Sequence, residues 1–125
     1  MEEQNQKSIL IIEDEPGIRD FICRVLQMEG YQVFQAGDGE SGLKMARERD
    51  FDLILLDVGL PGIGGFAVLQ ALKSGRKFER TAVVMMTASI EAGLREKAVR
   101  AGAADFLAKP MNAGSLRQVV AQILG

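Results

Sequence analysis

The chain has 125 residues, enough for one domain with a substantial core and too few for two ordinary ones. Apolar residues make up 47% and charged residues 26%, which is typical of folded globular proteins. The 15 basic and 17 acidic residues nearly balance, so bulk charge does not predict direct nucleic-acid or membrane binding. No apolar run approaches the roughly 20 residues of a membrane span. We expect a cytoplasmic protein with a polar tail over residues 1–7 and one domain over residues 8–125.

Two residue types constrain the chemistry by their scarcity. Histidine, the commonest general base and metal ligand, does not occur, so a reactive site must use carboxylates, lysine and hydroxyl groups. Cys23 is the single cysteine, which excludes an internal disulfide. It falls on an apolar helical face, where we expect a buried structural thiol.

Short apolar runs alternate with amphipathic stretches along the whole chain. Residues 53–56 are apolar without alternation, which is typical of a strand buried on both faces. The other predicted elements are a strand over 8–12, a helix from Pro16 to about Gly30, a strand over 31–36, a short helix capped by Asp38, a helix over 66–74, a strand over 81–86, a helix capped by Ser89 and ended by Gly102, a strand over 105–108 and a helix capped by Asn112.

Five strands that alternate with five helices predict an α/β fold with a parallel sheet covered on both faces. We expect a flavodoxin-like, doubly wound (βα)5 three-layer sandwich with the strand order 2-1-3-4-5. That order places the first and third strands side by side at the point where the chain direction across the sheet reverses. Ligands of such folds bind there, at the carboxyl ends of the strands.

The conspicuous polar residues all follow predicted strands. Glu13 and Asp14 follow the first strand, Asp57 ends the third, Thr87 follows the fourth and Lys109 follows the fifth. Carboxylates about 4 Å apart repel each other by roughly 4 kcal/mol at an effective dielectric near 20, so a cluster of three requires a counterion. Oxygen ligands without histidine or cysteine favour Mg²⁺. With a lysine and a hydroxyl group nearby, the set predicts a site that receives a phosphoryl group.

These residues resemble those of a known family, the receiver domains of two-component response regulators. The resemblance extends from Lys7 to Leu124. It rests on several spaced motifs: the acidic pair Glu13-Asp14, Asp57 within Leu-Leu-Asp-Val-Gly-Leu-Pro-Gly, Thr87-Ala88, Phe106 and Lys109-Pro110.

The resemblance implies a phosphoacceptor that assists its own phosphorylation and dephosphorylation, rather than an enzyme. Asp57 would accept the phosphoryl group from a histidine kinase or a phosphotransfer protein, in a reaction that requires Mg²⁺. The ion would be held by Asp14, Asp57 and the backbone carbonyl of Gly59, with Glu13 acting through water. The remaining phosphoryl contacts would come from Thr87, Ala88 and Lys109.

The resemblance also implies a switch and its readout. Thr87 would move toward the phosphoryl group and Phe106 would turn inward, which would change the surface of the fourth helix, fifth strand and fifth helix. A homodimer through that surface is a hypothesis that involves Lys97, Arg100, Asp105 and Arg117. The output partner or domain is not indicated. The kinase would dock on the first helix near Arg19, Ile22 and Cys23, and the Lys109-Pro110 peptide bond would be cis.

The sequence departs from the commonest family pattern in four places. Glu13 stands where Asp is more frequent, and Gly59 provides no side chain to shield the acceptor from water. Gly64 leaves the third helix without its usual cap, and Ala104 replaces an Asp that is frequent at the dimer face.

Three other functions fit parts of the same sequence. Residues 62–67 match the glycine pattern of a dinucleotide site, but they do not follow the first strand, and three acids would face the pyrophosphate. An aspartyl phosphatase would need an acid where Gly59 stands. A receiver-like scaffold that is never phosphorylated remains an alternative.

Overall fold

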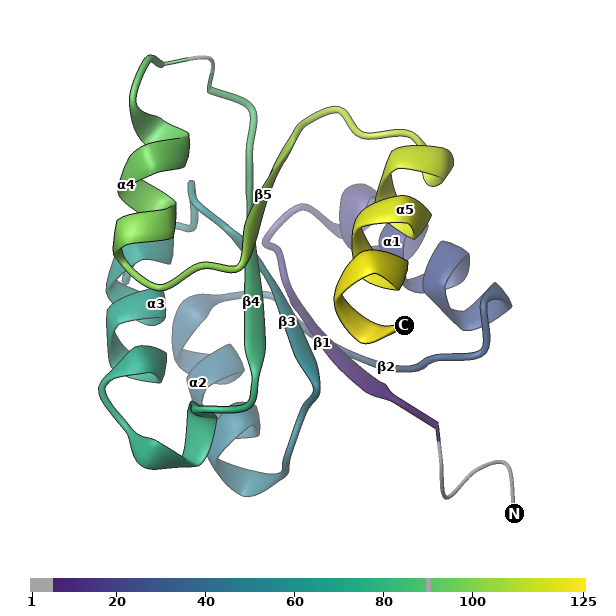
Figure 1. The fold of residues 1–125 in the computed structure, drawn as a ribbon, viewed down its shortest axis with the longest axis horizontal. Coiled ribbons are helices and arrows are strands. Elements are labelled where there is room, and N and C mark those ends of the chain that lie inside the picture. The colour runs from purple at the N-terminus through teal and green to yellow at the C-terminus, as the bar shows by residue number, and fades with distance from the viewer. Residues whose placement is uncertain (1–5, 90) are drawn as a thin grey trace.

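The computed structural model describes residues 6–89 and 91–125. A five-stranded parallel sheet has the order β2-β1-β3-β4-β5, which confirms the predicted fold class and strand order. Figure 1 shows the sheet between two layers of helices, with α2, α3 and α4 over one face and α1 and α5 over the other. The elements are β1 (Ser8–Ile12), α1 (Pro16–Met28), β2 (Gln32–Ala36), α2 (Gly39–Glu48), β3 (Leu53–Asp57), α3 (Gly65–Lys73), η2 (Arg76–Phe78), β4 (Ala82–Thr87), α4 (Leu94–Arg100), β5 (Asp105–Ala108) and α5 (Ala113–Leu124).

Alternate residues of each central strand divide the core into two parts. In β1, Leu10 and Ile12 pack on the side of α2, α3 and α4, whereas Ile9 and Ile11 pack on the side of α1 and α5. All five residues of β3 are buried. The strand therefore needs apolar side chains on both faces, which explains its unbroken run of hydrophobic residues. The first charged residue of this run, Asp57, appears only where the strand ends.

Side-chain capping explains where several helices begin. Asp38 accepts a hydrogen bond from the Ser41 amide, and Asn112 accepts one from the Ser115 amide, as predicted for both residues. Pro16 occupies the start of α1, while the side chain of Glu15 accepts a hydrogen bond from the Gly17 amide. The helix that was expected to lack a cap, α3, indeed has no side-chain cap.

The fourth helix begins later than the sequence predicted. Ser89 was expected to cap it, but its hydroxyl group accepts a hydrogen bond from the Glu91 amide in a local turn. The helix instead starts at Leu94 after Gly93, which has a positive φ of 85° and makes no side-chain cap bond. Only Ala98 of this short helix is buried. Across the described residues, no helix is both long and apolar enough to cross a bilayer.

Candidate functional site

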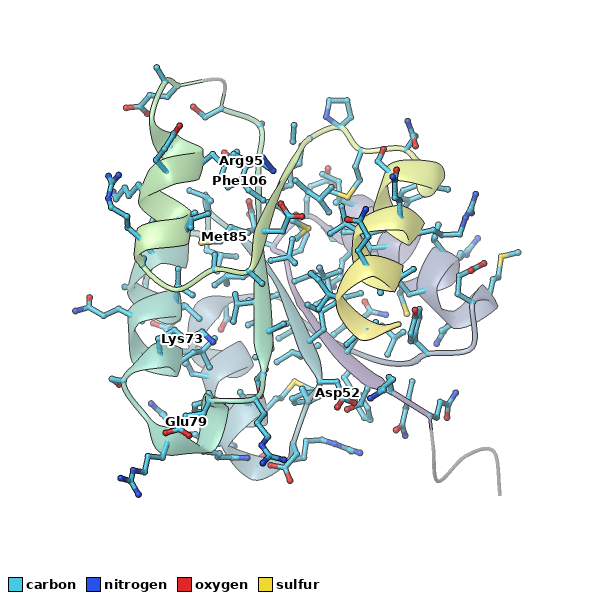
Figure 2. The ribbon with its side chains drawn as sticks, viewed as in Figure 1. Asp52, Lys73, Glu79, Met85, Arg95 and Phe106 are labelled. Carbon is cyan, nitrogen blue, oxygen red and sulfur yellow. The ribbon has the colours of Figure 1, made fainter. Side chains whose placement is uncertain are left out.

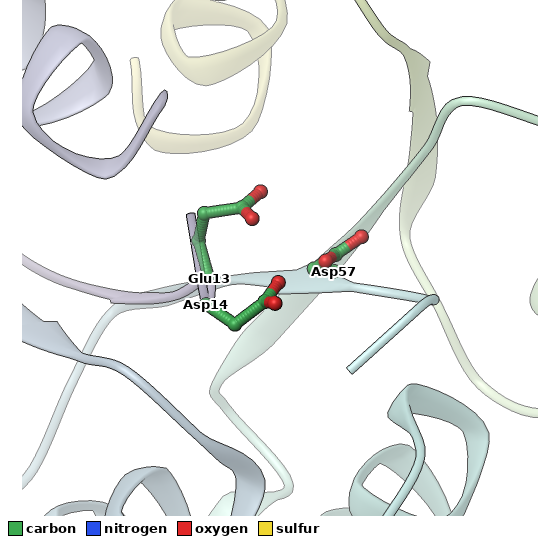
Figure 3. A group of neighbouring side chains, drawn as sticks. All are labelled: Glu13, Asp14 and Asp57. Atoms are coloured by element: carbon green, nitrogen blue, oxygen red, sulfur yellow. The ribbon is translucent and has the colours of Figure 1, made fainter. Parts of the chain in front are cut away.

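The carboxyl ends of β1 and β3 bring three carboxylates together. Glu13 and Asp14 follow β1, Asp57 ends β3, and these strands are direct neighbours in the sheet. One carboxylate oxygen from each residue lies within 4.8 Å of the other two (Figure 3). Glu13 is fully buried and Asp57 is 5% exposed, whereas Asp14 is exposed. The cluster therefore has two buried members and one that faces solvent.

Backbone contacts hold Asp57 at the strand end. The Val58 amide donates to the carbonyl of Met86 in β4, and the Gly59 amide donates to Oδ1 of Asp57 over 3.2 Å. A Cβ on Gly65 would lie 2.3 Å from the Asp57 carbonyl oxygen, so only glycine fits at the start of α3. These contacts keep the Asp57 carboxylate at the open edge. Because residue 59 is glycine, no side chain from that position covers the carboxylate.

Lys109 provides the positive charge of the site. Its Nζ lies 2.6 Å from Oε1 of Glu13 and 3.2 Å from Oδ1 of Asp57. Burial acts to lower the pKa of Lys109, but its contacts with Glu13 and Asp57 outweigh that effect and raise the pKa. Burial also raises the pKa of Glu13, against the lowering effects of Lys109 and the Glu15 amide. Three carboxylates and one ammonium group give the ionised cluster a net negative charge that favours a cation.

The ends of β4 and β5 complete one side of the site. Thr87 is buried, and its Oγ1 accepts a hydrogen bond from the Ser89 amide over 3.0 Å. Its backbone carbonyl accepts a hydrogen bond from the Lys109 amide over 2.7 Å. Ala88 is exposed beside them. A single pocket brings these positions next to the acid of β3, and its lining residues are Asp57, Val58, Gly59, Thr87, Ala88, Ser89 and Lys109.

Phe106 lies on β5, the strand next to β4, which ends at Thr87. It pairs with Met85 in the parallel register and is half-buried against the core beneath α2, α3 and α4. Next to it, Asp105 accepts a hydrogen bond from Arg95 of α4 over 2.9 Å. Figure 2 shows both Arg95 and Phe106 between α4 and β5. The aromatic ring is therefore near the surface, close to an ion pair that joins these two elements.

The donor set fits a hard divalent cation. All three acidic side chains offer oxygen atoms, and Asp14 reaches solvent, from which water ligands can come. Glu13 is less accessible to a metal ion, because its Oε1 contacts Lys109 and its Oε2 accepts a hydrogen bond from the Glu15 amide. The residues present suit Mg²⁺ better than a softer metal, since no thiolate or imidazole lies among them.

The structure adds contacts that the sequence did not indicate and corrects one prediction. The ion pair between Glu13 and Lys109 was not foreseen, because sequence spacing does not show which carboxylate a lysine reaches. On α1, the kinase was expected to dock near Ile22 and Cys23, but these residues are only 0% and 5% exposed. The exposed large apolar residues of α1 are instead Phe21, at 40%, and Met28 at the end of the helix, at 84%. The expected buried thiol is observed, and the Lys109-Pro110 peptide bond is cis.

Comparison with known proteins identifies the family. Residues 9–121 match the model of the response regulator receiver domain. The chain is 38% identical over 117 residues to the phosphate regulon transcriptional regulatory protein PhoB of Klebsiella pneumoniae, covering 94% of this chain and 50% of PhoB. It is 36% identical over 120 residues to sporulation initiation phosphotransferase F of Bacillus subtilis, covering 96% of this chain and 94% of that protein.

A solved structure agrees with these relatives. The receiver domain of the sensor histidine kinase PA1611 from Pseudomonas aeruginosa PAO1, with a magnesium ion coordinated in its active-site cleft, superposes with a TM-score of 0.87 at 29% identity. The match covers 96% of this chain and 98% of that one. The chain spans about half the length of the transcriptional regulators that it matches, such as PhoB. By family match, relatives and fold, the chain belongs to the response regulator receiver domains.

Proposed function

We propose that this domain is the phosphoacceptor switch of a two-component phosphorelay and that Asp57 is the acceptor. One observation carries the proposal: a carboxylate at a strand end lies beside two other acids and Lys109, in a pocket shared with Thr87. A carboxylate oxygen of Asp57 forms the bond to phosphorus while the bond from phosphorus to the donor histidine breaks. The electron pair of that bond leaves with the imidazole, so the domain assists the transfer without acting as a conventional enzyme.

Asp14, Asp57 and the backbone carbonyl of Gly59 are the residues that would hold Mg²⁺. The support is the oxygen donor set and the solvent access of Asp14. When bound, the ion offsets negative charge on the transferring phosphoryl group. Glu13 would contribute through water, because both of its oxygens already have protein partners.

Lys109, Thr87 and Ala88 would bind the phosphoryl oxygens that face away from the metal ligands. Lys109 already contacts Asp57, and its ammonium group can move from a carboxylate oxygen to a phosphoryl oxygen at little cost in charge pairing. The Thr87 side chain must rotate, because its Oγ1 accepts a hydrogen bond from the Ser89 amide in this structure. The rotation would exchange a local hydrogen bond for one to the phosphoryl group, which has stronger acceptors.

This rearrangement would be read on the surface formed by α4, β5 and α5. Phe106 of β5 is half-buried against the core beneath α2, α3 and α4, so room opened by Thr87 could be filled by its ring. The population of the inward state would rise with phosphorylation. That surface would contact an output domain or partner, and a homodimer through it is one form of output. Arg95 belongs to the surface through its ion pair with Asp105, whereas Lys97 lies over Phe66 of α3.

The phosphodonor would be a histidine kinase or a phosphotransfer protein in the cytoplasm. An apolar pocket beside the site supports docking there, since it joins the start of α1 to the loop after β5. Its apolar lining includes Ile18, Phe21, Pro110 and Met111. Lys109 also borders this pocket, so a docked donor would lie next to the acceptor site.

The proposal is tested by intact mass after incubation with a small-molecule phosphodonor, with and without Mg²⁺. We expect one phosphoryl adduct that requires Mg²⁺ and does not form on an Asp57→Asn variant. Asp50→Asn is the matched control, because Asp50 is an exposed acid at the opposite end of the sheet. An adduct that still forms on the Asp57 variant would show that another residue is the acceptor. A folded protein that binds Mg²⁺ but forms no adduct, even with a kinase, would favour the scaffold that is never phosphorylated.

A further inference from the structure

The loop that contains the acidic pair is held from outside the site by Arg19 of α1. Its Nη1 donates a hydrogen bond to the backbone carbonyl of Glu13 over 2.8 Å, and its Nε donates to Oε1 of Gln35 over 3.1 Å. The Glu13 amide donates to the carbonyl of Ala36, the last residue of β2. Beyond that contact the Glu13 carbonyl needs another donor, and Arg19 supplies it.

The held carbonyl belongs to the peptide unit that joins Glu13 to Asp14. Rotation of that unit would move the Asp14 carboxylate, because the Cα of Asp14 is part of the same plane. On the other side of the loop, Oε2 of Glu13 accepts the Glu15 amide, so the segment is fixed from both sides. Among the side-chain hydrogen bonds of the described residues, none involves the Asp14 carboxylate. Its direction therefore depends on the backbone.

We propose that Arg19 is a positioning residue, oriented by Gln35, that aims the Asp14 carboxylate at the metal site. This inference rests on the proposed role of Asp14 as a magnesium ligand. Arg19 touches neither the acceptor nor the phosphoryl group. It acts through the backbone of its neighbour, in the way that groups outside the ligand shell orient metal ligands. The planar guanidinium reaches two acceptors at once, one in the loop after β1 and one on β2, which a lysine cannot reproduce.

Charge and positioning make opposite predictions for this residue. Removing a positive charge beside a cation site favours cation binding, because the local potential becomes more negative. Releasing the Glu13 carbonyl disfavours it, because Asp14 then samples directions away from the site. If Arg19 acts by position, neutralising it weakens Mg²⁺ binding despite the favourable change in charge. The sign of the effect thus separates the two roles.

The test measures Mg²⁺ affinity without any phosphodonor, from amide chemical shifts of residues 14 and 59 in isotope-labelled protein. We expect Arg19→Gln to weaken binding about 5-fold, below the 10- to 100-fold typical of buried outer-shell partners because this contact is partly exposed. Arg19→Lys should recover only part of the loss. Gln35→Leu leaves the charge of the chain unchanged and should weaken binding about 2-fold. Arg24→Gln, which removes an exposed charge from the same helix, should not weaken binding.

Other outcomes would contradict the positioning role of Arg19, its contact with Gln35 or the metal site itself. Unchanged or tighter binding by Arg19→Gln, with a wild-type spectrum elsewhere, would overturn the positioning role and leave the proposed function intact. If the Arg19 variant does not fold, unchanged binding by Gln35→Leu would overturn the orienting contact and the proposal with it. Failure of the wild-type protein to bind Mg²⁺ would instead contradict the metal site itself.

Discussion

The two edges of the parallel sheet differ in how their polar groups are arranged. At the amino edge, where the strands begin, donors meet acceptors: the Ser8 amide donates to Asp52, the Thr81 hydroxyl donates to the Phe51 carbonyl, and Lys73 donates to the Thr81 carbonyl. Figure 2 labels Asp52 and Lys73 at this end of the molecule. At the carboxyl edge, where the strands end, Glu13, Asp14 and Asp57 bring like charges together.

Polar residues at the amino edge stabilise the fold, whereas those at the carboxyl edge form the proposed phosphoryl site. Each of these polar groups at the amino edge has a hydrogen-bond partner, as expected where burial must be compensated. At the carboxyl edge, Lys109 contacts two of the three acids, Glu13 and Asp57, so part of the repulsion within the cluster remains. The fold therefore tolerates an unfavourable cluster at the edge where a cation and a phosphoryl group would complete it. Changes at the two edges should have different consequences.

The largest expected effect comes from Lys109→Met at the carboxyl edge. The change leaves Glu13 buried without its cationic partner, so we expect a loss of about 2–4 kcal/mol of unfolding free energy at pH 7. Phosphorylation by a small phosphodonor should slow at least 100-fold, because the ammonium group also contacts the acceptor. Denaturant unfolding and intact mass measure the two effects.

The pH dependence of Lys109→Met follows from Glu13. Burial raises the pKa of Glu13, so the native state holds its proton more tightly than the unfolded state. A protonated Glu13 needs no ammonium partner, and the destabilisation by Lys109→Met should shrink as the pH falls from 7 toward 4.5. Adding Glu13→Gln to Lys109→Met should restore much of the stability and none of the phosphorylation. A destabilisation that is constant with pH would contradict this account.

At the amino edge, Thr81→Val should separate stability from activity. Thr81 is 7% exposed, and its hydroxyl donates to the Phe51 carbonyl over 2.9 Å. Valine keeps the shape but leaves a buried carbonyl unpaired, which costs about 1–2 kcal/mol of unfolding free energy. The rate of phosphorylation in conditions where the protein stays folded should not change. Thr81→Ser, which keeps the hydroxyl group, is the control, and a slowed reaction in the valine variant would break the separation of the two edges.

Gly59→Asn should change the carboxyl edge without changing the fold. A Cβ at this position would lie 4.0 Å from Oδ1 of Asp57, so a side chain has room to extend over the acceptor. We expect the phosphoryl group to persist a few times longer, because the side chain excludes water from the acyl phosphate. The decay of the phosphorylated mass after removal of the donor measures the lifetime. An unchanged or shorter lifetime would show that access through position 59 does not limit hydrolysis.

The smallest expected effect is that of Asp50→Asn at the amino edge. Asp50 is 95% exposed and forms an ion pair with Lys77 over 2.7 Å, which lowers the pKa of Asp50. A lowered folded pKa stabilises the protein above pH 3.8, and the contribution is lost as the pH falls through the folded pKa. We therefore expect a slight destabilisation near neutral pH that disappears in acid and in high salt. Thermal unfolding at several pH values measures it.

The strand and helix order followed from the sequence, because hydrophobic periodicity and capping residues are local signals. The bounds of β1 and β5 were predicted residue for residue, and Asp38 and Asn112 cap the helices expected of them. The start of α4 was predicted too early, because Ser89 forms a local turn with the same chemistry as a cap. Local signals do not say which of two competing hydrogen bonds the backbone adopts.

The acids of the site were also recognisable from the sequence, since charged residues directly after apolar strands mark the carboxyl edge of a parallel sheet. The contacts that these acids make were not recognisable from the sequence. Only the tertiary structure shows that Lys109 lies closer to Glu13 than to Asp57, that Thr87 contacts the Ser89 amide and that Arg19 holds the carbonyl between the two acids. These contacts join residues from different strands and helices, and their geometry depends on how the strands are ordered and how far each side chain reaches. The sequence determined which groups meet at the edge, and the packing of the sheet decided which of them touch.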